Sequence, residues 1–160
     1  MNLLLILMSF LTSNLKGYIA VGIPSGETRN LLKGGGTVGF DATIYQCRFL
    51  AAGISIEGSS FVMSGSGNSE IKLASIAPVV TLVPPLLRNI FSFEGRPLFT
   101  RFQIQNPSYT NVYYITGYSL GTDIKITDKP LKLYISVNYS NYRGIDKKFS
   151  FYNLGFALRM

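Results

Sequence analysis

Eight charged side chains are the candidates for chemistry in this sequence. Each falls on the polar face of a segment in which apolar and polar residues alternate, and acids and bases are mixed: Asp41, Glu57, Lys72, Arg101, Asp123, Lys125, Lys132 and Arg159. Inside a narrow fold such charges must pair, because burying an unpaired charge is costly. The set therefore predicts a salt-bridged interior that acts as a plug. The alternative interpretation is that they are the ordinary solvent-facing charges of a soluble sheet protein.

Catalytic and metal-binding chemistry is poorly supported by the remaining residues. The sequence has no histidine, which removes Ser-His and Cys-His nucleophilic pairs and the commonest metal ligand. Its one cysteine, Cys47, cannot form an internal disulfide. The glycine run from Gly34 to Gly36 is not followed by Gly-Lys-Ser/Thr, so it predicts a loop over residues 27–36 rather than a phosphate site. We expect no catalytic residue, no metal, no cofactor and no enzyme activity.

The elements that position these residues are strands. Residues 131–140 and 152–160 alternate strictly, with Leu133, Ile135 and Val137 on one face, and they flank a polar turn at residues 143–147. Residues 37–45 and 50–57 form a second hairpin around a connection at 46–48. Further strands are predicted near 18–24, 70–83, 98–105 and 111–127, with loops at 58–69 and 84–96. Pro78 requires a bulge, because proline cannot donate to a strand ladder.

About eight strands joined in succession by mostly short connections indicate an antiparallel up-and-down β-barrel. The last strand alternates apolar residues up to Met160 and is rich in aromatics, and in this it resembles the closing strand of small bacterial outer-membrane β-barrels of the outer-membrane protein A group. The resemblance implies apolar residues facing lipid, polar residues facing the interior, and both chain ends on the periplasmic side. The alternative fold is a soluble β-sandwich or jelly roll.

Composition favours the membrane interpretation. Charged residues make up 14% of the chain, against about 25% in ordinary soluble domains, and mean hydropathy is +0.25. The net charge of +7 is not gathered into a basic stripe with interleaved aromatics, so the sequence does not favour nucleic acid as a partner.

The first residues, MNLLLILMSFL, are too short an apolar run to span a membrane as a helix and fit the core of a secretory signal. We therefore expect a signal peptide at 1–17, cleaved after Gly17, and a single β-barrel domain at 18–160. The alternative is a buried first element of a protein that is not exported.

These observations predict a non-enzymatic barrel of the bacterial outer membrane with a structural, adhesive or envelope-interaction role. Expected partners are membrane lipids and, through basic loops such as 143–148, an envelope polysaccharide or another envelope protein. The alternative is a soluble or secreted all-β protein: a virion or capsid-type jelly roll, or a lipocalin-like ligand carrier with apolar residues inside. An enzyme is the third and least supported class.

Overall fold

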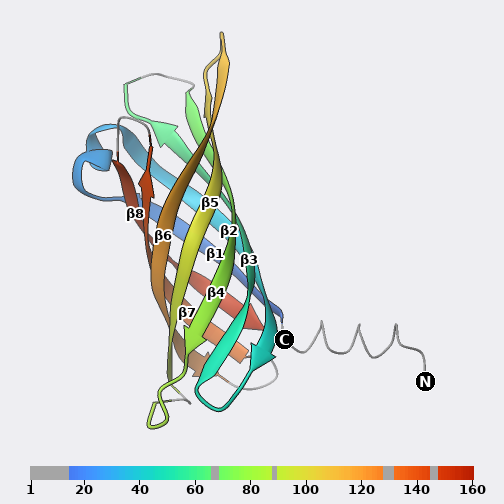
Figure 1. Cartoon of the computed structure of the whole chain (residues 1–160). Coiled ribbons are helices and arrows are strands. Elements are labelled where there is room, and N and C mark those ends of the chain that lie inside the picture. Colours follow the sequence, from blue (N-terminus) through green and yellow to red (C-terminus); the bar gives the residue numbers. More distant parts are fainter. Residues whose placement is uncertain (1–14, 66–68, 88–89, 128–131, 145–147) are drawn as a thin grey trace.

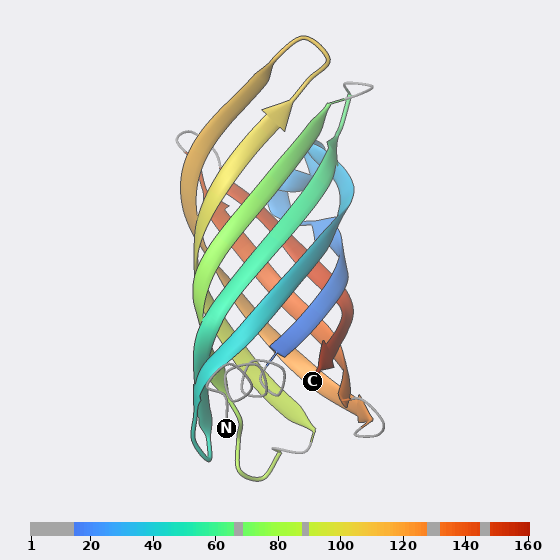
Figure 2. The ribbon, with the colours of Figure 1, turned by 90° about the vertical axis from the view of Figure 1, so that its right-hand side faces the viewer.

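The chain folds into a closed barrel of eight antiparallel strands in sequence order (Figures 1 and 2). A computed structural model describes residues 15–65, 69–87, 90–127, 132–144 and 148–160. The strands are β1 (Leu15–Pro24), β2 (Leu32–Gln46), β3 (Leu50–Met63), β4 (Glu70–Leu82), β5 (Phe91–Gln105), β6 (Thr110–Thr127), β7 (Lys132–Arg143) and β8 (Lys148–Arg159). One 3₁₀ turn, η1 (Gly26–Asn30), connects β1 to β2. Among the described residues, no helix has the length and apolar composition needed to cross a membrane.

Pairing of the first strand with the last closes the barrel. Ile19 of β1 lies opposite Val38 of β2 on one side and opposite Phe156 of β8 on the other. The predicted up-and-down barrel is thus confirmed. The sandwich and jelly-roll alternative is overturned, because every strand pairs with its neighbours in sequence and the sheet closes on itself.

Alternation along the strands separates an inner face from an outer face. In β7 the interior holds Tyr134, Ser136 and Asn138, while Ile135 and Val137 point outward, as predicted. In β8, Leu154 and Phe156 are about half exposed and Asn153 is buried. The polar face therefore points inward and the apolar face outward in this hairpin.

Three predicted loops are shorter than expected, because strand structure continues into them. Residues 32–36 belong to β2, residues 59–63 belong to β3, and residues 91–96 belong to β5. Gly35 fits in β2 because any larger residue would meet the carbonyl of Ser60 on β3, where a Cβ would lie 2.1 Å from the oxygen. Of the polar turn predicted at 143–147, residues 145–147 lie outside the described residues.

Pro78 lies in β4 without the predicted bulge. The β3–β4 register runs straight through it, with Pro78 opposite Ile54. On the other side the pairs Ile76↔Phe99 and Val80↔Gly95 share one register, which places Pro78 opposite Pro97 of β5. The β4–β5 ladder has no pairs between these two positions. The two prolines thus share one interruption of the ladder, because neither has an N–H to donate.

The two ends of the barrel differ. Leu15 and Met160 lie at one end, where the Met160 amide donates to the Leu15 carbonyl at 2.9 Å, together with residues 47–49 and 83–87. We call this the terminal end. The opposite, or loop, end carries η1 and the β5–β6 hairpin, which projects furthest from the barrel (Figure 1).

Candidate functional site

The barrel interior is filled by two layers of side chains. Towards the terminal end lies a charged layer made of Lys16, Asp41, Glu57, Glu94, Arg96 and Asp123, each at most 5% exposed. Towards the loop end lies an apolar layer made of Leu32, Phe61, Ile71, Leu73, Ala77, Leu98, Phe102, Ile115, Tyr142 and Phe151. Seven of the eight strands contribute to the apolar layer, so the lumen is packed across its width.

Lys16 is held by three carboxylates from three different strands. Its Nζ lies 2.6 Å from Asp123 Oδ2, 2.7 Å from Glu94 Oε1 and 3.5 Å from Asp41 Oδ2. Its position near the start of β1 aims the side chain into the lumen, where water cannot screen these contacts. Lysine is suited to this place because its ammonium has three donors and no acceptor.

Arg96 is the second cation of the charged layer. Its Nη2 lies 2.8 Å from Asp41 Oδ2 and 2.5 Å from Glu94 Oε2. Its Nη1 donates to the Tyr18 hydroxyl at 3.2 Å, and that hydroxyl donates in turn to Glu57 Oε2 at 2.7 Å. Lys16 and Arg96 therefore lie among the four carboxylates of the charged layer, and Glu57 also accepts hydrogen bonds from tyrosine hydroxyls.

The Tyr18 ring needs a glycine beside it. A Cβ at Gly39 on β2 would lie 2.3 Å from the ring carbon that carries the hydroxyl, so only glycine leaves room for the ring. The Arg96 guanidinium stands 5.1 Å from the ring centroid, within the range of a cation–π contact.

The apolar layer seals the lumen above the charges. Phe61 and Phe151, both fully buried, have ring centroids 4.5 Å apart, and Tyr142 stacks on Phe151 at 5.4 Å. The Tyr142 hydroxyl donates to Glu57 Oε1 at 3.3 Å, which ties the two layers together. These packed side chains fill the part of the lumen next to the charged layer.

The eight predicted charged residues take four kinds of position. Asp41, Glu57 and Asp123 lie in the charged layer, as expected. Arg159 lies at its edge, with Nη2 4.0 Å from both Glu94 Oε1 and Asp123 Oδ2 and a side chain 29% exposed. Lys125 lines a small cavity at the terminal end beside Arg159. The remaining three predicted residues point into solvent or outward from the barrel.

The inward placement predicted for Lys72 and Arg101 is wrong. Both lie on the outer face, where Lys72 contacts Glu70 and Gln105. Lys132 shares the alternation of the buried Tyr134 and Ser136, but it is exposed at the terminal end and lies outside the charged layer. The reason is that β4 and β5 carry apolar residues on their inner faces near the loop end, as Leu73 and Phe102 show. Assigning every apolar face to the outside inverted these two segments.

Three members of the charged layer were missed: Lys16, Glu94 and Arg96. Lys16 fell within the predicted signal peptide, and Glu94 and Arg96 fell within the predicted 84–96 connection. A usable signal was present for the last two, since Ser92, Glu94 and Arg96 continue the alternation that the prediction began only at Leu98. Two charges on the same face as Leu98 would have identified that face as the interior.

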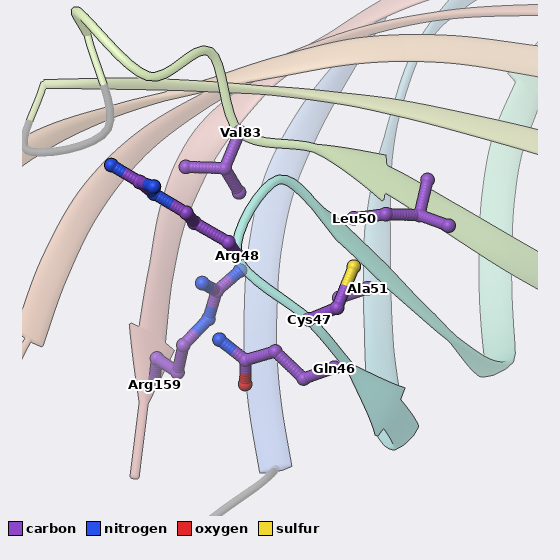
Figure 3. A pocket seen from close by; sticks show the side chains of 7 residues that line it. All are labelled: Gln46, Cys47, Arg48, Leu50, Ala51, Val83 and Arg159. Carbon is purple, nitrogen blue, oxygen red and sulfur yellow. The ribbon is translucent and has the colours of Figure 1, made fainter.

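A cavity of about 320 Å³ opens at the terminal end, around Gln46, Cys47, Arg48 and Arg159 (Figure 3). Cys47 is exposed in the β2–β3 connection, and its amide donates to the Leu50 carbonyl at 2.8 Å. Hydrogen bonds from the backbone of Phe49 and Leu50 lower the pKa of the Cys47 thiol. The thiol is thus an accessible chemical handle at this end of the barrel.

The charged layer connects strands across the lumen. The described residues include no group of three or more His, Cys, Asp or Glu side chains placed to hold a metal ion. The carboxylates of the charged layer face ammonium, guanidinium and phenol donors across the lumen. These contacts join β1, β2, β3, β5 and β6, so the charged layer is a brace across the barrel.

Comparison with known proteins gives matches of fold. No family model matches the sequence, and no curated protein is significantly similar to it. Among solved structures, Neisserial surface protein A has a TM-score of 0.66 at 12% identity, over 91% of this chain and 96% of that one. Ail, the attachment invasion locus protein of Yersinia pestis, in complex with the heparin analogue sucrose octasulfate, has a TM-score of 0.57 at 13% identity, over 92% and 97%. The N-terminal β-barrel domain of Pseudomonas aeruginosa OprF has a TM-score of 0.54 at 9% identity, over 91% and 97%.

These similarities extend over almost the whole length of each compared chain, and they agree with the strand order, the closure and the outward apolar faces described above. At such low sequence identity the agreement concerns the fold alone. The chain has the closed eight-stranded fold of the small outer-membrane β-barrels.

Proposed function

We propose that this protein is a non-conducting barrel of the bacterial outer membrane that serves a structural and surface-contact role. The observation that carries the proposal is the contrast between its outer and inner faces. Outside, the strands expose a band of apolar residues that includes Ile19, Phe40, Ile56, Phe99, Leu120 and Phe156, each between 54% and 64% exposed. Inside, the lumen holds buried charges.

The apolar band carries no outward charge on the last strand. On β8 it runs from Tyr152 to Leu158, and between these residues no charged side chain points outward. Allowing about 3.3 Å per residue and a strand tilt near 40°, this stretch of β8 alone accounts for roughly 15 Å of height. Tyr118, Tyr139 and Tyr152 form a row of outer-face aromatic contacts at its loop-end boundary, with centroids 6.4 and 5.1 Å apart. This is where membrane barrels carry an aromatic girdle.

A lipocalin-like carrier, the other barrel considered, would need the opposite arrangement. It would keep apolar side chains around an internal ligand cavity and charges on the outside. Here the terminal half of the interior is ionic, and the loop half is filled by packed rings such as Phe61 and Phe151. The exposed apolar band would make a soluble barrel aggregate.

The orientation proposed for the barrel places the terminal end in the periplasm and the loop end at the cell surface. The loop end is basic: its described cations are Arg29, Lys33, Lys72, Arg101, Arg143 and Lys148, against Glu27 and Glu70. We propose that this surface contacts anionic envelope components, including polysaccharide. The complex of Ail with a heparin analogue supports the idea that a barrel of this fold can present such a surface.

Reconstitution tests this function. The refolded protein should insert into lipid vesicles, shift its migration on gels only after heating, and give no stable conductance steps in planar bilayers. Failure to insert would refute the membrane placement, and stable ion conductance would refute the sealed interior. Adhesion is tested separately, by the salt concentration that elutes the folded protein from immobilised heparin. Arg29→Gln with Lys33→Gln should elute at lower salt than the parent, and Arg48→Gln with Lys132→Gln at the terminal end is the control matched in charge.

A further inference from the structure

We propose that the outer surface of β4, β5 and β6 holds one lipid with a phosphate headgroup, at the loop-end boundary of the apolar band. This inference rests on the proposed function and names a partner for one part of that surface. A groove of about 370 Å³ lies there, lined by Ala74, Ile76, Phe99, Arg101, Tyr114 and Thr116 among others.

The floor of the groove is formed by apolar side chains, and a small residue among them creates the depression. Strand pairing places Ala74 beside Arg101 and, one outward position closer to the terminal end, Ile76 beside Phe99. Ile76 and Phe99 are 55% and 58% exposed, so both offer apolar surface to a ligand. The short side chain of Ala74 leaves the depression between them, which suits an acyl chain lying along the strands.

The headgroup end of the groove is cationic. Arg101 lies opposite Tyr114 of β6, and Arg143 of β7 lies opposite Thr116, two residues along the same strand. With strands about 4.8 Å apart and a rise of about 3.3 Å per residue, the two arginine Cα atoms are about 12 Å apart. Both side chains are exposed, so their guanidinium groups can converge on one phosphate over Tyr114.

Neither arginine forms an ion pair with a carboxylate of the described residues. Arg101 donates one hydrogen bond, at 2.8 Å, to Gln103 Oε1, and no described carboxylate pairs with Arg101 or Arg143. Lys72, the third cation nearby, is already engaged by Glu70 at 3.5 Å. Guanidinium groups bind phosphate through paired, charge-assisted hydrogen bonds, so two arginines at a membrane boundary favour an anionic headgroup.

Depth in the membrane distinguishes a lipid from a soluble polyanion. On the outer face of β5, towards the loop end, Arg101 is the first charged residue. It follows the outward-facing run Phe93, Gly95, Pro97 and Phe99. A lipid phosphate lies at this boundary, directly above the acyl chains. A polysaccharide would use the cations but would leave the apolar floor uncovered.

Native mass spectrometry of the protein released from mixed micelles tests the proposal, with phosphatidylglycerol as the anionic probe and phosphatidylcholine as the zwitterionic one. The parent should retain one phosphatidylglycerol in preference to phosphatidylcholine. Arg101→Gln with Arg143→Gln should weaken this retention about tenfold or more, since it removes both phosphate contacts. The matched control, Arg48→Gln with Lys132→Gln, removes two cations from the opposite end and should leave retention unchanged.

A second variant separates the groove from the charges. Ala74→Trp fills the depression and keeps both arginines, so it should weaken phosphatidylglycerol retention but leave the binding of inositol hexakisphosphate as it is in the parent. Equal effects of this variant on both probes, or no effect on either, would overturn the lipid assignment in favour of a soluble polyanion. If the parent inserts into bilayers but retains no phosphatidylglycerol, this inference fails while the proposed function stands.

Discussion

Replacing Lys16 with methionine should strongly destabilise the barrel. Lys16 Nζ lies within 2.7 Å of both Asp123 and Glu94, and all three side chains are at most 5% exposed. Without it, the four carboxylates would keep Arg96 and, at 4.0 Å and partly exposed, Arg159. Removing one partner from a buried ion pair costs about 3–5 kcal/mol, and the upper part of that range applies here because Lys16 serves two close carboxylates. The expected loss of unfolding free energy is therefore about 4–5 kcal/mol.

Replacing Asp123, a carboxylate partner of Lys16, should destabilise the barrel less than replacing Lys16 does. Asp123→Asn removes one contact with Lys16, but it also removes a negative charge from a layer that has four carboxylates for two cations. Its cost should be smaller, about 1.5–3 kcal/mol, the value of a hydrogen bond to a charged group. Lys132→Met, which replaces an exposed lysine at the same end, is the control and should cost about 0–1 kcal/mol.

Urea titration of the three variants in lipid vesicles, followed by gel migration and tyrosine fluorescence, measures these differences. The reasoning is refuted if Lys16→Met unfolds at the same urea concentration as Lys132→Met, or if Asp123→Asn is the more damaging change. A chain that starts at Tyr18 should reproduce the loss seen in Lys16→Met, whereas one that starts at Leu15 should not. We therefore propose that any processing of this protein leaves Lys16 in place.

The remaining predictions concern the outer face, the apolar layer and the orientation. Ile135→Arg should lower the unfolding free energy in bilayers by about 2–4 kcal/mol, because Ile135 faces the middle of the apolar band. The control Asn141→Arg, beyond the boundary of the band, should lower it by about 0–1 kcal/mol. Equal urea midpoints for the two variants would contradict the lipid-facing assignment. Phe61→Ala should cost about 3–5 kcal/mol by leaving a cavity beside Phe151, and an unchanged urea midpoint would mean that the apolar layer is loosely packed. A bulky maleimide should fail to label Cys47 on intact cells and should label it after the outer membrane is opened. Ser108→Cys in a Cys47→Ser background should react on intact cells. The reverse pattern would mean that the barrel has the opposite orientation. Because the pKa of the Cys47 thiol is lowered, its labelling rate should rise at a lower pH than that of free cysteine, and identical pH profiles would contradict this environment.

Strand number, order and closure were predictable from the sequence, because alternation with a period of two is strong in β2, β7 and β8. The two faces of β7 were predictable for the same reason: Ser136 and Asn138 alternate with Ile135 and Val137, and a membrane barrel allows only one placement of each set.

The interior was predictable only in part. Alternation cannot tell which face of a strand points into the lumen wherever both the lumen and the outer surface carry apolar residues. This occurs in β4, where Leu73 packs inside and Ile76 faces outward. The identity of the charge partners depends on contacts across the lumen between residues far apart in sequence. Lys16 and Glu94, for example, are 78 residues apart, and no local pattern joins them.

The contact between Lys16 and Glu94 has a consequence for how the protein assembles. In a closed ring of eight strands in sequence order, β1 and β5 stand on opposite sides of the lumen, so this ion pair spans its full width. No single hairpin can form it, and an incomplete sheet leaves both charges in water. Most of the stabilisation from the charged layer therefore arrives late, when the ring is nearly complete. Folding should accordingly be slow and highly cooperative, and half-closed intermediates should not accumulate.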